Sequence, residues 1–262
     1  MANNARYNLM ELMVCVASRQ LEDGKTAVIG TGMPLAAAML AQNTASPNLI
    51  IMFEAGGIAP VLRQLPISVA DSNTQTDALM HSSMDVIMEA CARGTVDYTF
   101  LGGAQIDMYG NINSTMIGVD IQNPKVRLPG SGGANDLASL CWQTLIITPH
   151  DKRRFTNKLD FLTSPGYLTG PGARERAGLP PGTGPYKVIS TLALMGYDPE
   201  SKRMRVESLH PGITKEQVIE NTSFEMLFVD PLPHTPEPTD FELKVLREVV
   251  DPLGMVIGKP GK

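Results

Sequence analysis

Apolar residues recur at helical spacing in some segments and form short continuous runs in others. These two patterns predict the helices and the strands of the chain. Residues 7–20 (YNLMELMVCVASRQ) place Leu9, Leu12, Met13 and Val16 at helical spacing. The run "TAVIG" is typical of a short buried strand, and the glycine turn that follows leads into an Ala-rich helix, "GTGMPLAAAMLAQ". The next strand is "NLIIMFE". Helix, strand, glycine turn, helix and strand in this order indicate a parallel sheet with crossover helices.

The remaining pattern extends this fold and adds a second type of pairing. A helix is predicted over residues 76–93, then the strands "VDYTFLGGAQID" and "TLIITPH", separated by a glycine-rich loop that enters a helix at "GSGGANDLASLCWQ". Residues 160–190 form a long Gly- and Pro-rich loop. Antiparallel strands follow in "YKVISTLALMGYD" and "RMRVESLHPG", then a short helix "TKEQVIENTS" and a C-terminal helix "TDFELKVLREVVD" with Thr239 as its cap.

This pattern gives the predicted fold class. We expect an α/β fold, with an open and mainly parallel sheet, flanking helices and a β-rich C-terminal portion. No internal repeat and no linker divides the chain, so residues 1–262 are predicted to form a single domain.

Composition narrows the function classes. The chain is 43% hydrophobic and 19% charged, enough for a sizeable core, and its net charge of -5 does not favour binding to nucleic acid or to an anionic membrane. No run of about 18 apolar residues predicts a membrane span, and no signal peptide is recognised, so we expect a cytoplasmic protein. The three cysteines form no CxxC pair, and the four histidines lack metal-ligand spacing. We therefore predict no metal site, and a structural role for His210.

Three glycine-rich loops each follow an apolar run. They contain Gly30 and Gly32, residues 54–57, and residues 130–133. In an open α/β sheet, loops beyond the carboxyl ends of the strands converge on one crevice, where glycines expose amide N–H groups and allow close approach of a ligand. None of the three loops is a nucleotide-binding motif by itself, so three tight turns remain the alternative.

Glu54 is the unusual residue of these loops. It follows the apolar run Ile50–Phe53, and Ala55, Gly56 and Gly57 come directly after it. One interpretation is a capping or ion-paired acid, and the other is a nucleophile or general base that faces a ligand. In the second interpretation, the small residues beside Glu54 leave room for a bulky substrate.

Taken together and in order, the motifs resemble a known family. "GTGMPL", "FEAGG", "FLGGAQIDMYGNINST", "GSGGANDLAS", "HDKRRFTNKLDFLTSPG" and "GPGARERAGLP" resemble the class I CoA-transferases, and most closely β subunits of the glutaconate CoA-transferase type. The resemblance covers nearly the whole chain. It implies that Glu54, in the Glu-x-Gly motif, is the catalytic residue. It also implies that Gly132, Gly133 and Ala134 help to form an oxyanion site, and that Asn113 lies near the reacting thioester.

The resemblance also implies a reaction and a partner. The β subunit would move CoA between an acyl-CoA and a carboxylic acid, for example a dicarboxylate such as glutaconate, by a ping-pong mechanism through a glutamyl-CoA thioester on Glu54. The CoA thioester is then a substrate, with no permanently bound cofactor. The partner is a separate α subunit in an α2β2 or larger hetero-oligomer. One departure from the family pattern is Ala55, where familiar members carry Asn or Ser.

Two alternatives stay open at this point. The "SLHPGIT" and "NTSFE" segments resemble ring-cleaving hydrolases of the same superfamily, so a CoA-thioester hydrolase or a C–C-cleaving enzyme with Glu54 as general base is the second hypothesis. The third is a non-catalytic binding subunit.

Four other residues and one basic run are open to more than one interpretation. Asp107 and Asp136 are expected in turns or caps. Residues 152–154 (KRR) are expected on a solvated face, with CoA phosphates or the partner subunit as the alternatives. Arg174 and Arg176 could meet a dicarboxylate or form ion pairs at the loop edge.

Overall fold

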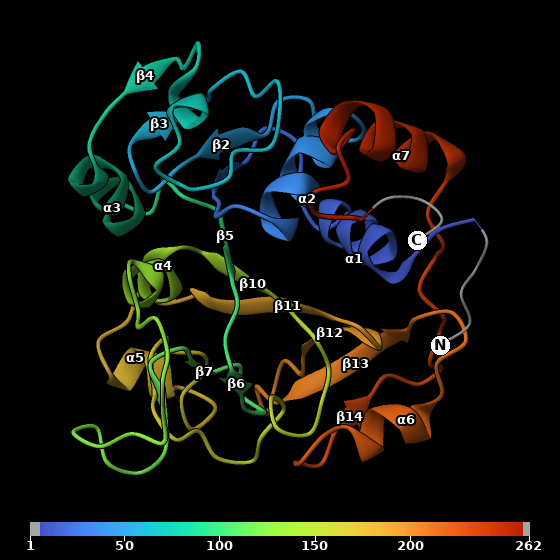
Figure 1. Cartoon of the computed structure of the whole chain (residues 1–262). Coiled ribbons are helices and arrows are strands. Elements are labelled where there is room, and N and C mark those ends of the chain that lie inside the picture. The colour runs from blue at the N-terminus through green and yellow to red at the C-terminus, as the bar shows by residue number, and fades with distance from the viewer. Residues whose placement is uncertain (1–5, 259–262) are drawn as a thin grey trace. The chain divides into compact units, whose positions relative to one another are not determined.

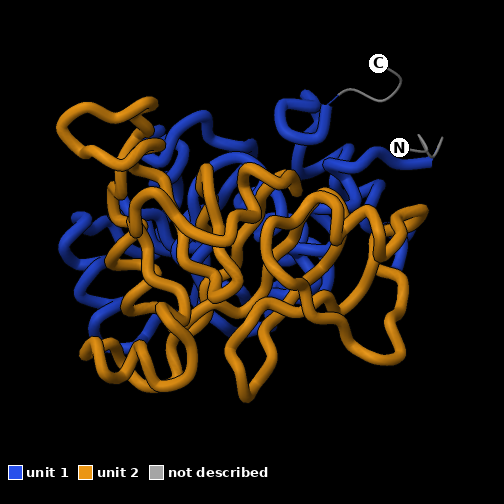
Figure 2. Tube along the Cα trace, turned by 90° about the horizontal axis from the view of Figure 1, so that it is seen from below, with its two compact units in different colours: residues 1–100, 236–262 blue, residues 101–235 orange. Residues whose placement is uncertain are grey.

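The computed structural model describes residues 6–258, and these form two compact units. Unit 1 comprises residues 1–100 and 236–262, and unit 2 comprises residues 101–235 (Figure 2). Unit 1 therefore contains both ends of the chain, while unit 2 is one continuous segment. The single domain predicted over residues 1–262 stays a prediction, because compactness alone does not define a domain.

Unit 1 contains the first three helices, the C-terminal helix and the first five strands. The helical segments are α1 (Leu9–Ser18), α2 (Met33–Gln42), η1 (Ser72–Gln75), α3 (Met84–Ala92), α7 (Asp240–Val245) and the π-helical η2 (Leu246–Val250). The strands are β1 (Thr26–Val28), β2 (Ile50–Met52), β3 (Gly57–Ile58), β4 (Met80–His81) and β5 (Tyr98–Leu101), of which the last residue belongs to unit 2.

Strand β1 is the middle one of the three parallel strands in unit 1. It pairs in parallel with β2 on one side and with β5 on the other, so that Ala27 stands opposite both Ile51 and Tyr98. All three side chains are buried, as expected for a parallel sheet covered on both faces. Strands β3 and β4 then continue from β2 in antiparallel pairing. The predicted helix, strand, glycine turn, helix and strand are confirmed here.

Helices α1 and α2 lie side by side, and α7 with η2 packs against α2 (Figure 1). Helix α1 starts with a capping box between Asn8 and Glu11, and α7 starts with one between the predicted cap Thr239 and Glu242. The helix predicted over residues 76–93 is wrong in its first half. Residues 80–81 form β4 on the edge of the sheet, and the helix begins only at Met84.

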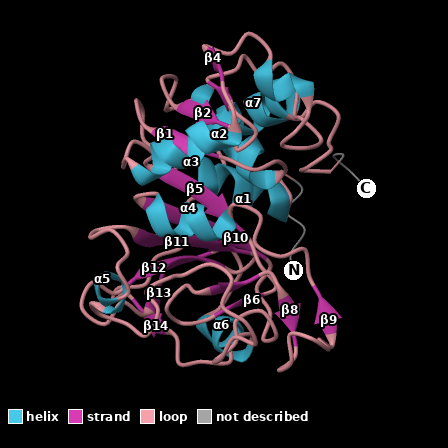
Figure 3. Cartoon of the chain, turned by 90° about the vertical axis from the view of Figure 1, so that its left-hand side faces the viewer, coloured by secondary structure: helices cyan, strands magenta, loops and turns pink. Residues whose placement is uncertain are grey.

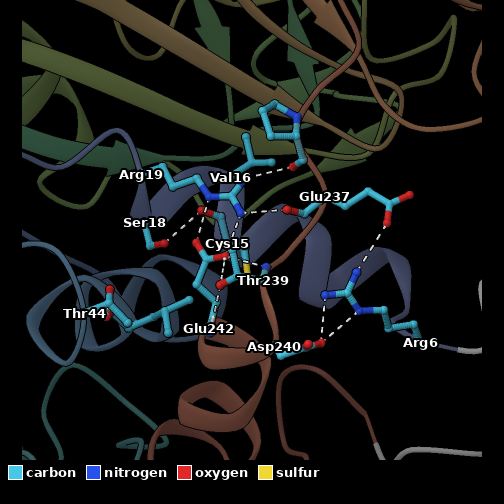
Figure 4. Close-up of polar contacts among 12 residues, drawn as sticks. Arg6, Cys15, Val16, Ser18, Arg19, Thr44, Glu237, Thr239, Asp240 and Glu242 are labelled. Atoms are coloured by element: carbon cyan, nitrogen blue, oxygen red, sulfur yellow. Dashed lines mark hydrogen bonds and ion pairs between the residues drawn. The ribbon is translucent and has the colours of Figure 1, made fainter.

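The C-terminal segment is tied to α1 by a bidentate ion pair (Figure 4). Arg19, directly after α1, donates to both carboxylate oxygens of Glu242 at 2.7 and 2.6 Å, and to the carbonyls of Pro236 and Glu237. Burial acts to raise the pKa of Glu242, but the hydrogen bonds from Arg19 and Thr239 lower it on balance. A second pair joins Arg247 to Glu11. These contacts close the end of the chain onto its beginning.

Unit 2 contains the remaining strands and three short helices. The strands are β6 (Gln105–Ile106), β7 (Ile112–Asn113), β8 (Met116–Ile117), β9 (Val126–Arg127), β10 (Gln143–Thr148), β11 (Gly184–Ser190), β12 (Ala193–Tyr197), β13 (Met204–Leu209) and β14 (Leu227–Phe228). The helices are α4 (Ala134–Leu140), α5 (Ala173–Arg176) and α6 (Lys215–Glu220).

Five strands of unit 2 lie side by side in the order β10, β11, β12, β13 and β14 (Figure 3). The pairing of β10 with β11 is parallel, β11 to β13 form an antiparallel meander, and β14 adds in parallel to β13. The predicted antiparallel strands are thus confirmed, and so is the β-rich C-terminal portion. Strands β6 with β7 and β8 with β9 form two small hairpins. Val188, Met195 and Val206 pack in the core of this unit.

Membrane spans and metal clusters are both absent from the described part of the chain. Within residues 6–258, no helix is long and apolar enough to cross a membrane. In the same range, no three His, Cys, Asp or Glu side chains are grouped so that they could hold a metal ion.

Candidate functional site

Glu54 lies in the tight turn between β2 and β3. The amide of Phe53 donates to the carbonyl of Gly57 at 2.8 Å, and the amide of Gly56 donates to the carbonyl of Phe53 at 2.9 Å. This is a three-residue hairpin loop in which Glu54 and Ala55 hold the two central turn positions. The Glu54 side chain is half-buried, and no residue between 6 and 258 forms a hydrogen bond or ion pair with its carboxylate. Within the described chain, Glu54 is therefore neither a capping acid nor an ion-paired acid.

The glycines beside Glu54 make room for neighbouring backbone of the same chain. Gly56 has a φ of +115°, and a Cβ at that position would lie 2.0 Å from the carbonyl oxygen of Ser82. A Cβ at Gly57 would lie 2.1 Å from the carbonyl oxygen of Thr74. The prediction that these glycines leave space for a bulky substrate is therefore wrong, because neighbouring backbone fills that space.

The glycines of the first loop, unlike those beside Glu54, have open space next to them. A Cβ at Gly30 or Gly32 would meet nothing within 4 Å. Gly32, the N-cap of α2, needs to be glycine because its φ is +82°, but Gly30 has no such constraint. Neither backbone geometry nor packing within residues 6–258 explains the glycine at position 30. Gly30 thus stays a candidate for close approach by a ligand.

The third glycine loop leads into α4 in unit 2. The amide of Ala134 donates to the carbonyl of Ser131 at 2.9 Å, so this amide is already used. No acceptor within the described chain is found for the amides of Gly132 and Gly133. Gly132 has a φ of +48°, a left-handed conformation that favours glycine. Of the three predicted oxyanion residues, Gly132 and Gly133 keep N–H groups that could meet a substrate oxygen.

Asn113 holds the segment next to this loop. Its side chain is fully buried, with an exposed fraction of 0%. Its amide nitrogen donates to Gln105 Oε1 and to the carbonyl of Met116, both at 2.7 Å, and its Oδ1 accepts from the amide of Thr115 at 3.0 Å. Every polar atom of the side chain has a partner, so Asn113 shapes the backbone of this segment.

The Asn113 segment and the third glycine loop are bound together. Ser114 and Gly130 exchange two hydrogen bonds of 2.9 Å, one from the amide of Gly130 and one from the hydroxyl of Ser114. Thr163 accepts from the amide of Ser114, and Asn135 donates to the carbonyl of Thr163. The segment that contains Asn113 and the loop that contains Gly132 and Gly133 are therefore joined through their neighbours Ser114 and Gly130 and through Thr163.

The two aspartates after the glycine loops have local roles, as expected. Asp107 accepts from the amides of Tyr109 and Asn111 and from the Asn111 side chain, and burial raises its pKa. Asp136 is exposed in the first turn of α4. In the basic run of residues 152–154, Lys152 and Arg153 are exposed, as predicted for a solvated face. Arg154 is half-buried instead, and it pairs with Asp151 and donates to the carbonyl of Gly103.

Arg174 differs from its prediction. Its side chain is buried, with an exposed fraction of 2%, and it donates to the backbone carbonyls of residues 138, 139, 165 and 166 and to Thr183 Oγ1. Burial lowers its pKa. Neither a dicarboxylate site nor an ion pair at the loop edge fits these contacts. Arg174 instead binds the C-terminal carbonyls of α4 to the Gly- and Pro-rich loop, and Arg176 donates to the carbonyl of Pro171.

A buried histidine pair is the feature that sequence analysis missed. His150 contacts Ser190 Oγ at 2.9 Å and Thr222 Oγ1 at 3.0 Å, while His210 contacts Thr235 Oγ1 at 3.0 Å and the Ser190 carbonyl at 2.8 Å. Burial lowers the pKa of each histidine to about 4. The structural role predicted for His210 is confirmed. The sequence gives no local signal for His150, because the partners of the two histidines, Ser190, Thr222 and Thr235, come from three separate segments.

Comparison with known proteins decides the family. The model of the family described as Coenzyme A transferase matches residues 11–221. The chain belongs to the coenzyme A transferase family. The B subunit of 3-oxoadipate CoA-transferase from Pseudomonas knackmussii is 40% identical to this CoA-transferase chain over 242 residues, 92% of each protein. The B subunit of glutaconate CoA-transferase from Acidaminococcus fermentans is 38% identical over 259 residues, 96% of each.

A solved structure supports the same conclusion for the fold of this CoA-transferase chain. The crystal structure of glutaconate coenzyme A-transferase from Acidaminococcus fermentans matches with a TM-score of 0.92 and 35% identity, covering 98% of this chain and 100% of that chain. The predicted α/β fold and the predicted family, with its resemblance to β subunits of the glutaconate CoA-transferase type, are both confirmed.

Proposed function

We propose that this chain is the β subunit of a CoA-transferase that moves CoA between an acyl-CoA and a carboxylic acid, with Glu54 as the nucleophile. The observation that carries the proposal is a half-buried carboxylate at a hairpin turn, without a partner among residues 6–258, in a chain of the CoA-transferase family. A carboxylate held in place but left unpaired keeps its lone pairs available for attack.

The covalent steps balance without a net proton. A Glu54 carboxylate oxygen attacks the thioester carbon, the C–S bond breaks, and CoA leaves as the thiolate. The thiolate then attacks Glu54 Cδ of the mixed anhydride, which releases the first acid as its carboxylate and leaves a glutamyl-CoA thioester. The acceptor carboxylate attacks Cδ and expels the thiolate again. Thiolate attack on the acceptor's carbonyl carbon finally regenerates Glu54 and gives the new acyl-CoA.

The other predicted residues take supporting roles in this proposal. Each tetrahedral oxyanion needs preorganised donors, and the family resemblance assigns this role to Gly132 and Gly133. The proposal is supported by their amides, which have no acceptor among the described residues. One such donor is typically worth about 3–4 kcal/mol of transition-state stabilisation. The resemblance implies that Ala134 belongs to the same oxyanion loop and that Asn113 lies near the thioester, and the buried side chain of Asn113 fixes the segment around Ser114, which bonds to Gly130. Gly30 and Gly32 allow close approach of the substrate. We propose the CoA thioester as a substrate and no permanently bound cofactor.

The names of the two relatives suggest a partner subunit and an acid substrate to propose for this chain. Both relatives are named as the B subunit of their enzymes, so we propose that this chain works with a separate α subunit in a hetero-oligomer of α2β2 or larger form. The relatives' names contain 3-oxoadipate and glutaconate, which are dicarboxylates, and a dicarboxylate is therefore the first acceptor to test. Arg174 does not bind its second carboxylate, because that guanidinium is buried among carbonyls.

The test is to trap the enzyme-bound intermediate. The chain, purified with its partner subunit, is incubated with an acyl-CoA but no acceptor and treated with hydroxylamine, which converts a glutamyl thioester to a hydroxamate. Mass spectrometry should locate the modification on Glu54. It should be absent in Glu54→Gln and present in Glu22→Gln, which alters an exposed glutamate of the same unit. Full exchange activity in Glu54→Gln would refute the proposal, and steady release of CoA without an acceptor would favour a hydrolase.

A further inference from the structure

The turn that contains Glu54 depends on one residue that lies outside the glycine loops and the family motifs. Ser82 follows β4, and it directs two donors at a single acceptor. Its amide donates to the carbonyl of Gly56 at 3.0 Å, and its hydroxyl donates to the same oxygen at 2.8 Å. The Ser82 carbonyl occupies the position where a Cβ of residue 56 would lie. Ser82 therefore contacts the Glu54 turn through its amide, its carbonyl and its hydroxyl.

The turn needs such a contact because its own backbone is unusually free. Gly56 and Gly57 are consecutive glycines, and glycine adopts positive and negative φ with little energetic preference. The φ of +115° at Gly56 is one of several conformations open to that residue. The two hydrogen bonds between Phe53 and the glycines close the loop, but neither involves the carbonyl of Gly56. Ser82 is the residue that fixes the orientation of this peptide group.

The position of Glu54 follows from that peptide group. Only Ala55 separates Glu54 from Gly56, and the Glu54 carboxylate has no partner of its own among residues 6–258. No hydrogen bond of its own fixes the carboxylate, so the backbone of the turn sets where the side chain starts. A rotation of the Gly56 peptide would move the carboxylate, and a displacement of about 1 Å at a reacting group can cost about 100-fold in rate.

We propose that Ser82 is a positioning residue for the nucleophile, and that its hydroxyl sets the rate at which Glu54 attacks the thioester. This inference rests on the proposed function of Glu54. Ser82 takes no part in bond making or breaking. Its effect should therefore appear in the rate of the first covalent step and not in the affinity for the acyl-CoA.

The experiment compares Ser82→Ala, which removes only the hydroxyl donor, with Ser82→Thr, which keeps it. Each variant is purified with its partner subunit, mixed with an acyl-CoA without acceptor, and sampled over time for the adduct on residue 54. We expect the rate of adduct formation to fall about 10- to 100-fold in Ser82→Ala and to recover to within about 3-fold of wild type in Ser82→Thr. The KM for the acyl-CoA should change by less than about 2-fold in both variants, because uniform binding is untouched.

Two controls separate positioning from general damage. Ser83→Ala alters the next serine, the N-cap of α3, which makes no hydrogen bond to Gly56, and its adduct rate should stay near that of wild type. Ser82→Cys keeps the side-chain volume with a weaker donor, so it should lie between alanine and wild type even if Ser82→Ala were poorly folded. Thermal melting of each complex checks that the variants are folded.

The outcomes distinguish this inference from the proposal it rests on. If Ser82→Ala and Ser82→Cys form the adduct at the wild-type rate while Glu54→Gln forms none, Glu54 is the nucleophile and Ser82 does not position it. If the wild-type complex exchanges CoA but never carries an adduct on residue 54, the proposed function fails, and with it the role of Ser82. A fall in rate matched by an equal rise in KM would also overturn the positioning role.

Discussion

The buried histidine pair should make this protein sensitive to mild acid. The Thr222 hydroxyl donates to the carbonyl of Val218, so it accepts from His150, which then carries its proton on Nε2. His210 faces the Ser190 carbonyl with Nε2, so this nitrogen carries a proton as well. His210 is then complete as a neutral imidazole, because the Thr235 hydroxyl can donate to its Nδ1 and accept from Ser208. At His150, the ring Nδ1 and the Ala193 carbonyl compete for the single proton of the Ser190 hydroxyl. A second proton on either ring would put a charge in the core of unit 2.

The sign and size of the effect follow from the pKa values. Burial lowers the pKa of each histidine from 6.5 to about 4, with Asp151 opposing the shift at His150 and His210 adding to it. Between these values the unfolded chain binds more protons than the folded one, so stability is complete above pH 6.5 and falls as the pH drops toward 4. From pH 7 to pH 5 the loss is about 2 kcal/mol for each histidine, or about 4 kcal/mol for the pair.

The assay is denaturant unfolding at pH 7, 6 and 5, followed by the fluorescence of Trp142. This is the only tryptophan of the chain and it lies in unit 2, so it reports on the unit that contains both histidines. His150→Gln and His210→Gln should each remove about half of the pH dependence, and the double variant nearly all of it. His81→Gln, which alters an exposed histidine of unit 1, should leave the dependence unchanged. Wild type and double variant losing stability in parallel, within about 1 kcal/mol, would refute the reasoning.

Two further predictions concern contacts within each unit. Arg19→Ala leaves the mostly buried carboxylate of Glu242 without its bidentate partner, and we expect a loss of about 2–3 kcal/mol in the free energy of unfolding, with Arg19→Lys recovering part of it. Gly196→Ala should cost about 1–2 kcal/mol in chemical denaturation, because a Cβ there would lie 2.2 Å from Glu207 Oε1 and displace it from Lys187. Stability unchanged in either alanine variant would contradict the role given to that contact.

Much of the fold followed from the sequence because its signals are local. The helical period of residues 7–20, the Ala-rich helix after Gly32 and the cap at Thr239 each depend on a few neighbouring residues. The failure at residues 76–83 has a tertiary cause. Met80 and His81 pair with β3 as an edge strand, and nothing in their own spacing distinguishes them from the first turn of a helix.

The candidate site was predictable in identity but not in its contacts. The family motifs located Glu54 and the third glycine loop, whereas the reasons for their neighbours are long-range. Position 56 is glycine because the carbonyl of Ser82, 26 positions further along the chain, fills the space of a side chain there. Arg174 is buried because it binds backbone carbonyls of residues in α4. A sequence pattern records which residues are small or charged. It does not record which distant backbone will occupy the space or accept the hydrogen bond.

The closure of α7 onto α1 has a consequence for the order in which the protein can fold during synthesis. Residues 6–100 are synthesised before unit 2, and the whole of unit 2 is synthesised before Glu242. Unit 2 is one continuous segment, so it can begin to fold while the nascent chain is still growing. The face of α2 that packs against η2 stays uncovered until η2 has been made. Residues 6–100 are thus made before unit 2 but gain their C-terminal contacts only after it. A chain that ended before Pro236 would leave this face of α2 uncovered for good.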